Sequence, residues 1–294
     1  MLQGKRKLMV VFTLAVAISL MGYAHTSMAE ELKVLTFGLT PTEDAETMIR
    51  NAKPTVEFLS KKLNMKVKPY VTTDYSGIIE AFRAKKLDVG RISPTTYVLS
   101  SKLADIEPFM VEIDAKHKSA SYRAIFISRS DSDIYSLGDL KGKTFAFVDP
   151  SSTSGHVIPR VYFKRWGLDP SKDIKEVFYS GSHDSSCMAV KNKKVDAASV
   201  SEGRLYDLFK KGYAKPEEFR IFLWSDPVPM SPYVWRADLP ADLKAKIREA
   251  FMAIPIETYK SYRKALGFIP ADDAMYNVVR EAADIVGLKY GKKK

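Results

Sequence analysis

Apolar and polar positions along this chain alternate with two periods, one typical of strands and the other of helices. Three strand-like runs of the first part span residues 32–38, 65–71 and 87–92. Helical spacing of apolar residues follows these runs, over residues 42–62, 76–84 and 94–102. Pro54 marks either a kink in the first helix or the boundary between two helices. The strand–helix rhythm predicts a parallel sheet with helices on its faces.

Residues 122–127 form a strand-like run rich in aromatic and β-branched residues, and a second α/β series follows from residue 137 to about residue 222. Its further strand-like runs span 144–148, 174–178 and 197–200, and its helical runs span 156–166, the segment after His183, and 203–210. Residues 224–234 are dense in proline and resemble a chain crossing between lobes, whereas residues 240–263 and 271–286 are again helical.

These patterns predict an α/β protein with two lobes, each a mixed, mostly parallel sheet flanked by helices. Residues 30–118 and 225–294 form the first expected lobe, and residues 119–224 form the second. The hinge candidates are residues 118–122 and 224–232. A ligand cleft is expected between the lobes, outside the carboxyl ends of the strands.

The first 29 residues have the features of a signal peptide. Lys5, Arg6 and Lys7 precede an apolar run over residues 8–21, and Ser27 and Ala29 are small residues at the positions that a signal peptidase reads. The run is shorter than the ~20 residues of a membrane span, although an uncleaved anchor stays the alternative. We expect an exported protein that is cleaved near Ala29.

Charge and cysteine content narrow the function classes. The formal net charge is +11, and it falls to +8 once the three basic residues of the signal peptide are removed. Because the basic residues are spread along the chain, they indicate a diffuse positive field rather than a nucleic-acid footprint. Cys187 is the only cysteine, so no internal disulfide forms, and we expect this residue to be a small buried apolar one.

Hydroxyl-rich loops follow four of the expected strands. The densest is Ser151-Ser152-Thr153-Ser154, placed where a strand leads into a helix. The other three loops span residues 72–76, 93–97 and 179–186. A single such loop is as well explained by an ordinary helix cap. Four of them at equivalent ends of strands predict a donor-rich cleft for a small oxyanion, assisted by helix N-termini.

Several of these segments resemble one protein family. Residues 73–81, the run Ser151-Ser152-Thr153-Ser154-Gly155-His156, and residues 181–184 look like the substrate-binding proteins of phosphate, phosphite and phosphonate ABC transporters. Residues 195–198 and 267–271 fit the same pattern. The resemblance covers nearly all of the chain after the signal peptide, in order.

The resemblance implies a type II periplasmic binding protein, monomeric and without a cofactor or metal, that delivers a phosphorus oxyanion to a membrane permease. The ligand-binding residues that it implies, with Glu202 added as a candidate, are Tyr75, Thr96, Tyr97, Ser151, Ser152, Thr153, Ser154, His183, Asp184 and Glu202. In this interpretation the two tyrosines, the Ser/Thr loop and His183 donate hydrogen bonds. Asp184 either orients His183 or accepts from a protonated ligand oxygen.

Two departures from the family pattern leave the organic substituent of the ligand open. Arg91 stands ahead of Ser93-Pro94, and we expect it to be an exposed arginine at the end of a strand rather than part of the cleft. Glu202 either meets the amine of an aminoalkyl phosphonate or caps the helix that begins there. The expected cleft therefore binds its anion with neutral donors and a helix dipole, without a buried lysine or arginine.

Three other functions compete with transport of a phosphorus oxyanion. A hydrolase is disfavoured because the Ser/Thr loop lacks the Gly-x-Ser-x-Gly pattern and the four histidines are isolated. A sensor protein with the same fold would present its ligand to a membrane receptor instead of a permease. A third alternative keeps transport and changes the cargo to a sulfonate, another oxyanion or an organic molecule.

Overall fold

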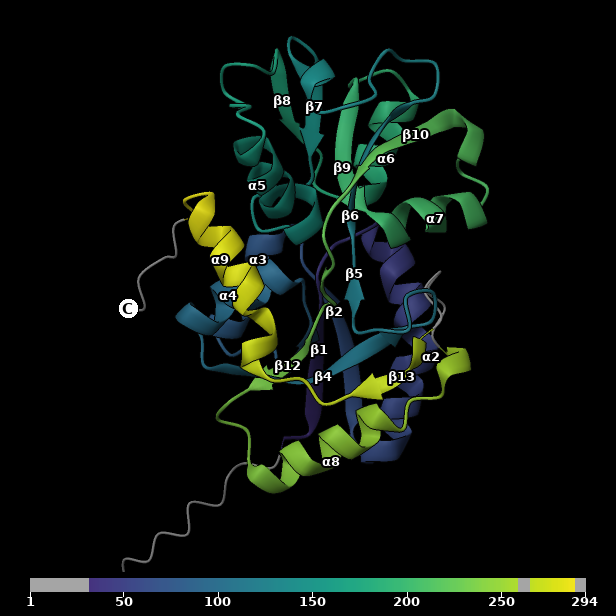
Figure 1. Cartoon of the computed structure of the whole chain (residues 1–294). Helices are drawn as coiled ribbons and strands as arrows, with labels where there is room; N and C mark the ends of the chain where they lie inside the picture. Colours follow the sequence, from purple (N-terminus) through teal and green to yellow (C-terminus); the bar gives the residue numbers. More distant parts are fainter. Residues whose placement is uncertain (1–31, 259–264, 289–294) are drawn as a thin grey trace, which may run out of the picture. The chain divides into compact units, whose positions relative to one another are not determined.

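Two mixed β-sheets flanked by helices form the framework of the protein (Figure 1). This computed structural model describes residues 32–258 and 265–288, so the expected signal peptide and its cleavage point lie outside the described residues. The helix expected over residues 240–263 also runs partly outside them. Among the described residues, no helix has the length and apolar character needed to cross a bilayer.

The larger sheet has six strands in the order β13-β4-β12-β3-β1-β2. Their bounds are β1 Val34–Leu39, β2 Lys66–Val71, β3 Val89–Arg91, β4 Ile106–Asp114, β12 Tyr233–Arg236 and β13 Ala265–Ile269. Strand β1 pairs in parallel with β2 and β3, whereas β12 is antiparallel to β3 and β4, and β13 is antiparallel to β4. The helices of this part are α2 Ala45–Leu63, α3 Tyr75–Arg83, α4 Pro94–Leu103, α8 Ala241–Met252 and α9 Asn277–Ile285.

The smaller sheet has five strands in the order β10-β6-β9-β7-β8. Their bounds are β6 Ala124–Arg129, β7 Thr144–Phe147, β8 Glu176–Tyr179, β9 Ala197–Ser201 and β10 Phe219–Trp224. Strand β7 is parallel to β8 and β9, whereas β6 is antiparallel to β9 and β10. Helices α5 Ile158–Arg165, α6 His183–Lys191 and α7 Glu202–Lys210 accompany it, with short 3₁₀ turns at Gly138–Leu140 and Pro216–Glu218. Further 3₁₀ turns lie at Ile256–Thr258 and Asp273–Tyr276.

The two segments expected to cross between lobes pair with each other. Strand β5, Ser121–Tyr122, is antiparallel to β11, Val228–Pro229, and the two form a ribbon of their own. The strands of the larger sheet lie before and after this ribbon in sequence, and those of the smaller sheet lie between its two halves. The division into lobes at residues 118 and 225 stays a prediction.

Aromatic side chains fill the core beside each sheet. In the larger sheet, Phe109 and Trp235 stack with ring centroids 4.2 Å apart, and Phe251 of α8 meets Phe109 edge-on at 5.5 Å. In the smaller sheet, Phe145 of β7 contacts Phe163 of α5 at 5.1 Å. Such pairs add about 0.5–1.5 kcal/mol each beyond the burial of their area. Cys187 of α6 is buried in a separate cluster with Ile125 and Ala146, as its apolar character predicts, and burial raises the pKa of its thiol.

The chain pattern located most elements of the series but missed several late strands. Strands β1, β2, β3, β7, β8 and β9 lie within two residues of their expected bounds. Helix α2 is a single helix that contains Pro54, so this proline does not separate two helices. Strands β4, β10, β12 and β13 were not expected, and β12 lies in the proline-dense segment. Their pairing is antiparallel and long-range, which local periodicity does not report. Neither sheet is therefore mostly parallel as expected: two of the five pairings in the larger sheet and two of the four in the smaller sheet are parallel.

The turn from β7 into α5 depends on Gly155. A Cβ atom on this residue would stand 2.4 Å from Cγ2 of Val148 and 2.5 Å from its Cβ. Ser152 caps the segment, because its Oγ accepts a hydrogen bond from the N–H of Gly155 at 3.1 Å. The first turn, Thr153–Val157, is a π-turn, so the expected helix over 156–166 begins three residues earlier and becomes α-helical at Ile158. π-turns of this kind often occur at functional sites.

His156 anchors the same turn from inside. Its ring is 3 % exposed, Nδ1 lies 2.9 Å from the carbonyl oxygen of Pro150, and Nε2 lies 3.2 Å from the hydroxyl of Tyr179. A neutral ring that donates from Nδ1 and accepts at Nε2 satisfies both contacts. Burial, more than any other cause, lowers the pKa of His156 from 6.5 to about 4.

We expect His156 to make the protein less stable in acid. The unfolded chain protonates this ring near pH 6.5, whereas the folded protein does so near 4. The free energy of unfolding is therefore highest above pH 6.5 and falls as the pH drops to about 4, by roughly 3 kcal/mol from this ring. Urea unfolding of the parent protein and of His156→Asn, which keeps an N–H for Pro150, measures the difference. Parallel stability curves for the two proteins between about pH 7 and pH 4 would contradict the assignment.

Candidate functional site

A polar pocket of about 100 Å³ brings together five of the ten residues named from the sequence. These five are Tyr75, Ser152, Thr153, Ser154 and His183. They come from the starts of three helical segments, α3, the turn after β7, and α6. Helix starts carry N–H groups without intrahelical partners and the positive end of the helix dipole, so their convergence favours an anion.

The hydroxyl of Tyr75 is an unsatisfied donor in this pocket. The side chain is completely buried, and its hydroxyl makes no hydrogen bond of good geometry among the described residues, although the nearby side chain of Ser152 lowers its pKa against the larger effect of burial. Burial is the main cause that raises the pKa of this phenol, so the hydroxyl keeps its proton. A buried, unpaired hydroxyl costs ~1–3 kcal/mol. A ligand that accepts a hydrogen bond from Tyr75 would recover that cost.

The Ser/Thr loop contributes its hydroxyls and the start of a helical segment. Ser152, Thr153 and Ser154 are each at most 2 % exposed. The hydroxyl of Thr153 donates to Oγ1 of Thr95 at 3.0 Å and accepts from the N–H of Thr95 at 2.8 Å. The loop before α4 is thereby joined to the loop after β7. One wall of the pocket therefore belongs to the smaller sheet and is fixed to an element of the larger one.

His183 is oriented by the end of strand β9. The backbone N–H of Ser201 donates to its Nδ1 at 3.2 Å. The neutral ring therefore carries its proton on Nε2, because Nδ1 acts as the acceptor. Ser201 also lines the pocket, so the group that fixes the tautomer lies in the same wall as the ring.

Three residues named from the sequence lie beside the pocket or outside it. The carbonyl oxygen of Ser151 accepts from the hydroxyls of Ser93 and Thr96, at 3.2 and 3.3 Å. Ser151 and Thr96 thus join the two loops, and neither lines the pocket. Tyr97 also lies outside the lining, and its hydroxyl donates to Asp273 while its ring meets Tyr276.

The two acidic residues named from the sequence are bound by cations of the protein itself. Asp184 accepts from Nη2 of Arg204 at 3.2 Å. Glu202 is 1 % exposed and accepts from His117 at 2.8 Å and from Lys116 at 3.4 Å. Neither residue lines the pocket. Glu202 also stands in the first turn of α7, where a carboxylate is favoured by the helix dipole.

The expectation of a cleft without buried arginines is wrong. Arg91 and Arg204 both line the pocket, and their side chains are 30 % and 16 % exposed. Arg91 binds the buried Glu112 through Nε at 2.8 Å and Nη2 at 3.0 Å. The departure at Arg91 was visible in the sequence, but its orientation depends on Glu112 of β4, a strand that the pattern did not reveal.

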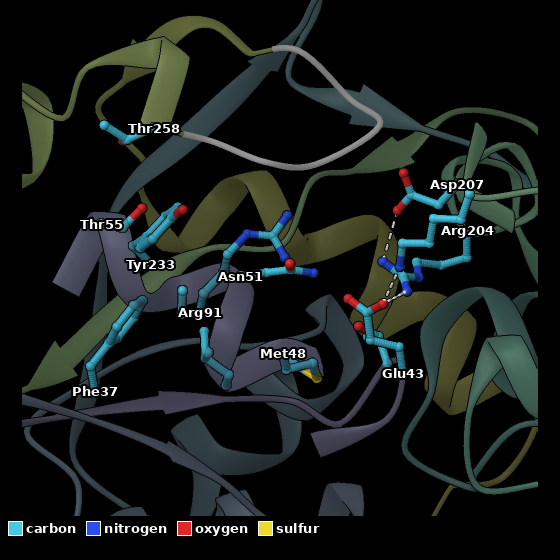
Figure 2. A pocket seen from close by; sticks show the side chains of 14 residues that line it. Phe37, Glu43, Met48, Asn51, Thr55, Arg91, Arg204, Asp207, Tyr233 and Thr258 are labelled. Atoms are coloured by element: carbon cyan, nitrogen blue, oxygen red, sulfur yellow. Dashed lines mark hydrogen bonds and ion pairs between the residues drawn. The ribbon is translucent and has the colours of Figure 1, made fainter. Parts of the chain in front are cut away.

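Arg204 was not named from the sequence at all. It binds Glu43 at 2.7 Å, Asp207 at 2.8 Å and Asp184 at 3.2 Å, and Figure 2 shows its contacts with Glu43 and Asp207. Lys211 binds the same Glu43 at 2.5 Å. Burial would raise the pKa of Glu43, but the two cations outweigh burial and hold it below its usual range. Only the spacing of Arg204 and Asp207 on one helix was available as a signal in the sequence.

No group of three or more metal-binding side chains occurs within residues 32–258 and 265–288. What the described pocket offers is a set of hydroxyl and N–H donors, a histidine with a defined tautomer, and two arginines paired with carboxylates. Such groups are suited to binding and orienting an oxyanion.

Comparisons with known proteins identify the family of this chain. The family model described as "ABC transporter, phosphonate, periplasmic substrate-binding protein" matches residues 37–276. The phosphonates-binding periplasmic protein of Escherichia coli is 30 % identical, over 93 % of this chain and 83 % of its own length. The phosphate-import protein PhnD of Mycolicibacterium smegmatis is 25 % identical, over 87 % of this chain and 86 % of its own.

A solved structure is similar to this chain in fold and in sequence. The binding-protein component of an ABC phosphonate transporter from Pseudomonas aeruginosa has a TM-score of 0.81 and 27 % identity, with 87 % of each chain covered. The fold is that of a type II periplasmic binding protein, as the sequence predicted. The family match spans far more than half of the chain and includes every residue that lines the polar pocket. The chain therefore belongs to the periplasmic substrate-binding proteins of phosphonate ABC transporters.

Proposed function

We propose that this protein captures a phosphorus oxyanion, a phosphonate, phosphite or phosphate, in the polar pocket and delivers it to an ABC transporter permease. The observation that carries the proposal is the buried hydroxyl of Tyr75, which lacks a partner among the described residues and stands in a pocket with the start of the Ser/Thr turn and His183. A tetrahedral oxyanion offers acceptors in several directions at once. It is therefore the ligand class that such converging donors satisfy best.

Hydrogen bonds to a charged oxygen supply the affinity in this proposal. Each contributes ~1.5–3 kcal/mol, and the described pocket is lined by Tyr75, His183 and the side chains of Ser152 and Ser154, whereas the hydroxyl of Thr153 already donates to Thr95. Arg91 and Arg204 add a positive edge, but their charge is already balanced by Glu112, Glu43 and Asp207. The oxyanion therefore meets oriented dipoles more than free charge.

The proposal extends to location and mode of action. The protein acts in the periplasm after cleavage near Ala29, as a monomer, and without catalysis. Contacts between the loops at Thr95 and Thr153 join the walls of the pocket. A ligand that contacts both walls would stabilise this joined form over an open one.

A titration series tests the cargo. Isothermal titration with phosphate, phosphite, methylphosphonate and methanesulfonate should give heat with at least one phosphorus compound, at one ligand per chain. The same compound should raise the melting temperature, because it binds only the folded form. No heat with the three phosphorus compounds, or a preference for the sulfonate, would overturn the assignment.

Replacement of Tyr75 by Phe tests the unsatisfied donor. We expect Tyr75→Phe to weaken oxyanion binding about tenfold or more. The ligand-free variant should be as stable as the parent or more so, since an unpaired buried hydroxyl is removed. Tyr162→Phe is the matched control, because its hydroxyl bonds Asp226 at 3.2 Å outside the pocket. Equal affinities of parent and Tyr75→Phe would remove this residue from the binding site.

His183 is tested by two substitutions with different donors. His183→Ala removes the ring N–H, and we expect it to weaken binding about tenfold or more. His183→Gln restores an N–H near the position of Nε2 and should recover part of that loss. Titration of the same phosphorus compound measures both variants. If Ala and Gln reduce affinity equally, the ring acts by its shape and not as a donor.

A further inference from the structure

A second chamber of about 150 Å³ adjoins the polar pocket. The two cavities share Thr42, Arg91, Arg204 and Asp207, so their linings are continuous. In the view of Figure 2, Phe37, Thr55 and Tyr233 lie on one side of the chamber, and the cluster of Glu43, Arg204 and Asp207 lies on the other. The chamber is therefore reached past the two arginines of the oxyanion pocket.

One face of helix α2 forms an extended part of the chamber wall. Met48, Asn51, Ala52 and Thr55 all line it, at helical spacings of three and four residues. Phe37 of β1 and Tyr233 of β12 add aromatic surface, with ring centroids 6.3 Å apart. The wall is thus largely apolar, with an amide and hydroxyls at single points, as is typical of sites for small organic groups.

The carboxylates that face the two cavities are already bonded to cations of the protein. Glu43 accepts from Arg204 and Lys211, and Asp207 accepts from Arg204. Glu112, behind Arg91, accepts from Arg91 and from the hydroxyl of Tyr233 at 3.1 Å. An incoming ammonium group would have to displace these resident cations.

One of the two arginines at the junction keeps a donor that the protein leaves unused. The Nε of Arg204 is buried and has no partner among the described residues. Arg91 engages Glu112 through Nε at 2.8 Å and Nη2 at 3.0 Å, and it borders both cavities. Because carboxylates balance both guanidinium charges, the free donor suits an uncharged acceptor such as a hydroxyl or carbonyl oxygen better than a second anion.

We infer that the second chamber holds the organic substituent of the phosphorus ligand, and that this substituent is uncharged, with an acceptor oxygen near the phosphorus or an apolar body. The inference rests on the proposed function, since it assumes that the oxyanion occupies the polar pocket. It excludes aminoalkyl phosphonates as the preferred ligands. It also gives the chamber wall on α2 a role in specificity.

A ligand series tests the chemistry of the substituent. Isothermal titration compares methylphosphonate with phosphonates that carry 2-hydroxyethyl, n-butyl, 2-aminoethyl and 2-carboxyethyl groups. We expect the hydroxyethyl and butyl compounds to bind at least as tightly as methylphosphonate, and the two charged ones about tenfold or more weakly. Tightest binding of the aminoethyl or carboxyethyl compound would overturn the inference while supporting the proposed function. No binding of any of the five overturns the inference, and it overturns the proposed function as well if phosphate and phosphite also fail to bind.

Filling the chamber tests the location. Ala52→Trp places an indole against the chamber and should weaken butylphosphonate about tenfold or more, with methylphosphonate changed by less than about threefold. Lys53→Trp is the matched control on the same helix, because the Lys53 side chain is 73 % exposed. Equal losses for both ligands, or none for butylphosphonate, would overturn the location. If Ala52→Trp does not fold, Ala52→Leu provides the same comparison with a smaller side chain.

Discussion

The close approach of the backbone at Gly155 to Val148 sets the position of the whole Ser/Thr turn. A Cβ atom on Gly155 would stand 2.4 Å from Cγ2 of Val148. The start of the helical segment therefore packs directly against the residue that follows β7. Ser152 then caps the segment, and His156 fixes it through the carbonyl of Pro150. The donors of the turn consequently converge on a pocket that also contains Tyr75 and His183. Without this approach the hydroxyls would serve as ordinary caps at separate places.

The charged side chains around the pocket are paired within the protein, whereas its hydroxyl and N–H dipoles line the cavity. Arg91 and Arg204 are each paired with carboxylates inside the protein, so they contribute shape and donors more than net charge. A buried charge without a partner would be costly, and a fully paired one is close to neutral in its effect on stability. Although the protein as a whole is basic, both arginines that line the pocket are therefore neutralised by carboxylates of the protein. The same pairing sets the character of the adjoining chamber.

The local elements were predicted well, because helical and strand periodicity report which side of an element is buried. Strands β1 and β2 and helices α3 and α4 were found near their bounds for this reason. Strands β4, β10, β12 and β13 were missed, since their partners are distant in sequence and β12 lies among prolines. Tyr75 and His183, at the starts of α3 and α6, could be named because loops after strands gather at one edge of a sheet and because the family resemblance implied these two residues within the loops. Arg204 could not, because three carboxylates from distant segments decide its orientation.

The sequence by itself determined the fold class, the family and the hydroxyl-rich composition of the loops, since these depend on periodicity and on runs such as Ser151-Ser152-Thr153-Ser154. Only the tertiary structure decided which candidates share a pocket. It placed Tyr97 with Asp273, Glu202 with His117, and Arg91 in the lining of the polar pocket. The hydrogen-bond partners of Tyr97 and Glu202 are 85 or more residues away in sequence. The partner of Arg91 is Glu112, which lies on another strand of the same sheet. These pairings depend on which buried groups meet when the sheets assemble, and no local pattern in the chain encodes them.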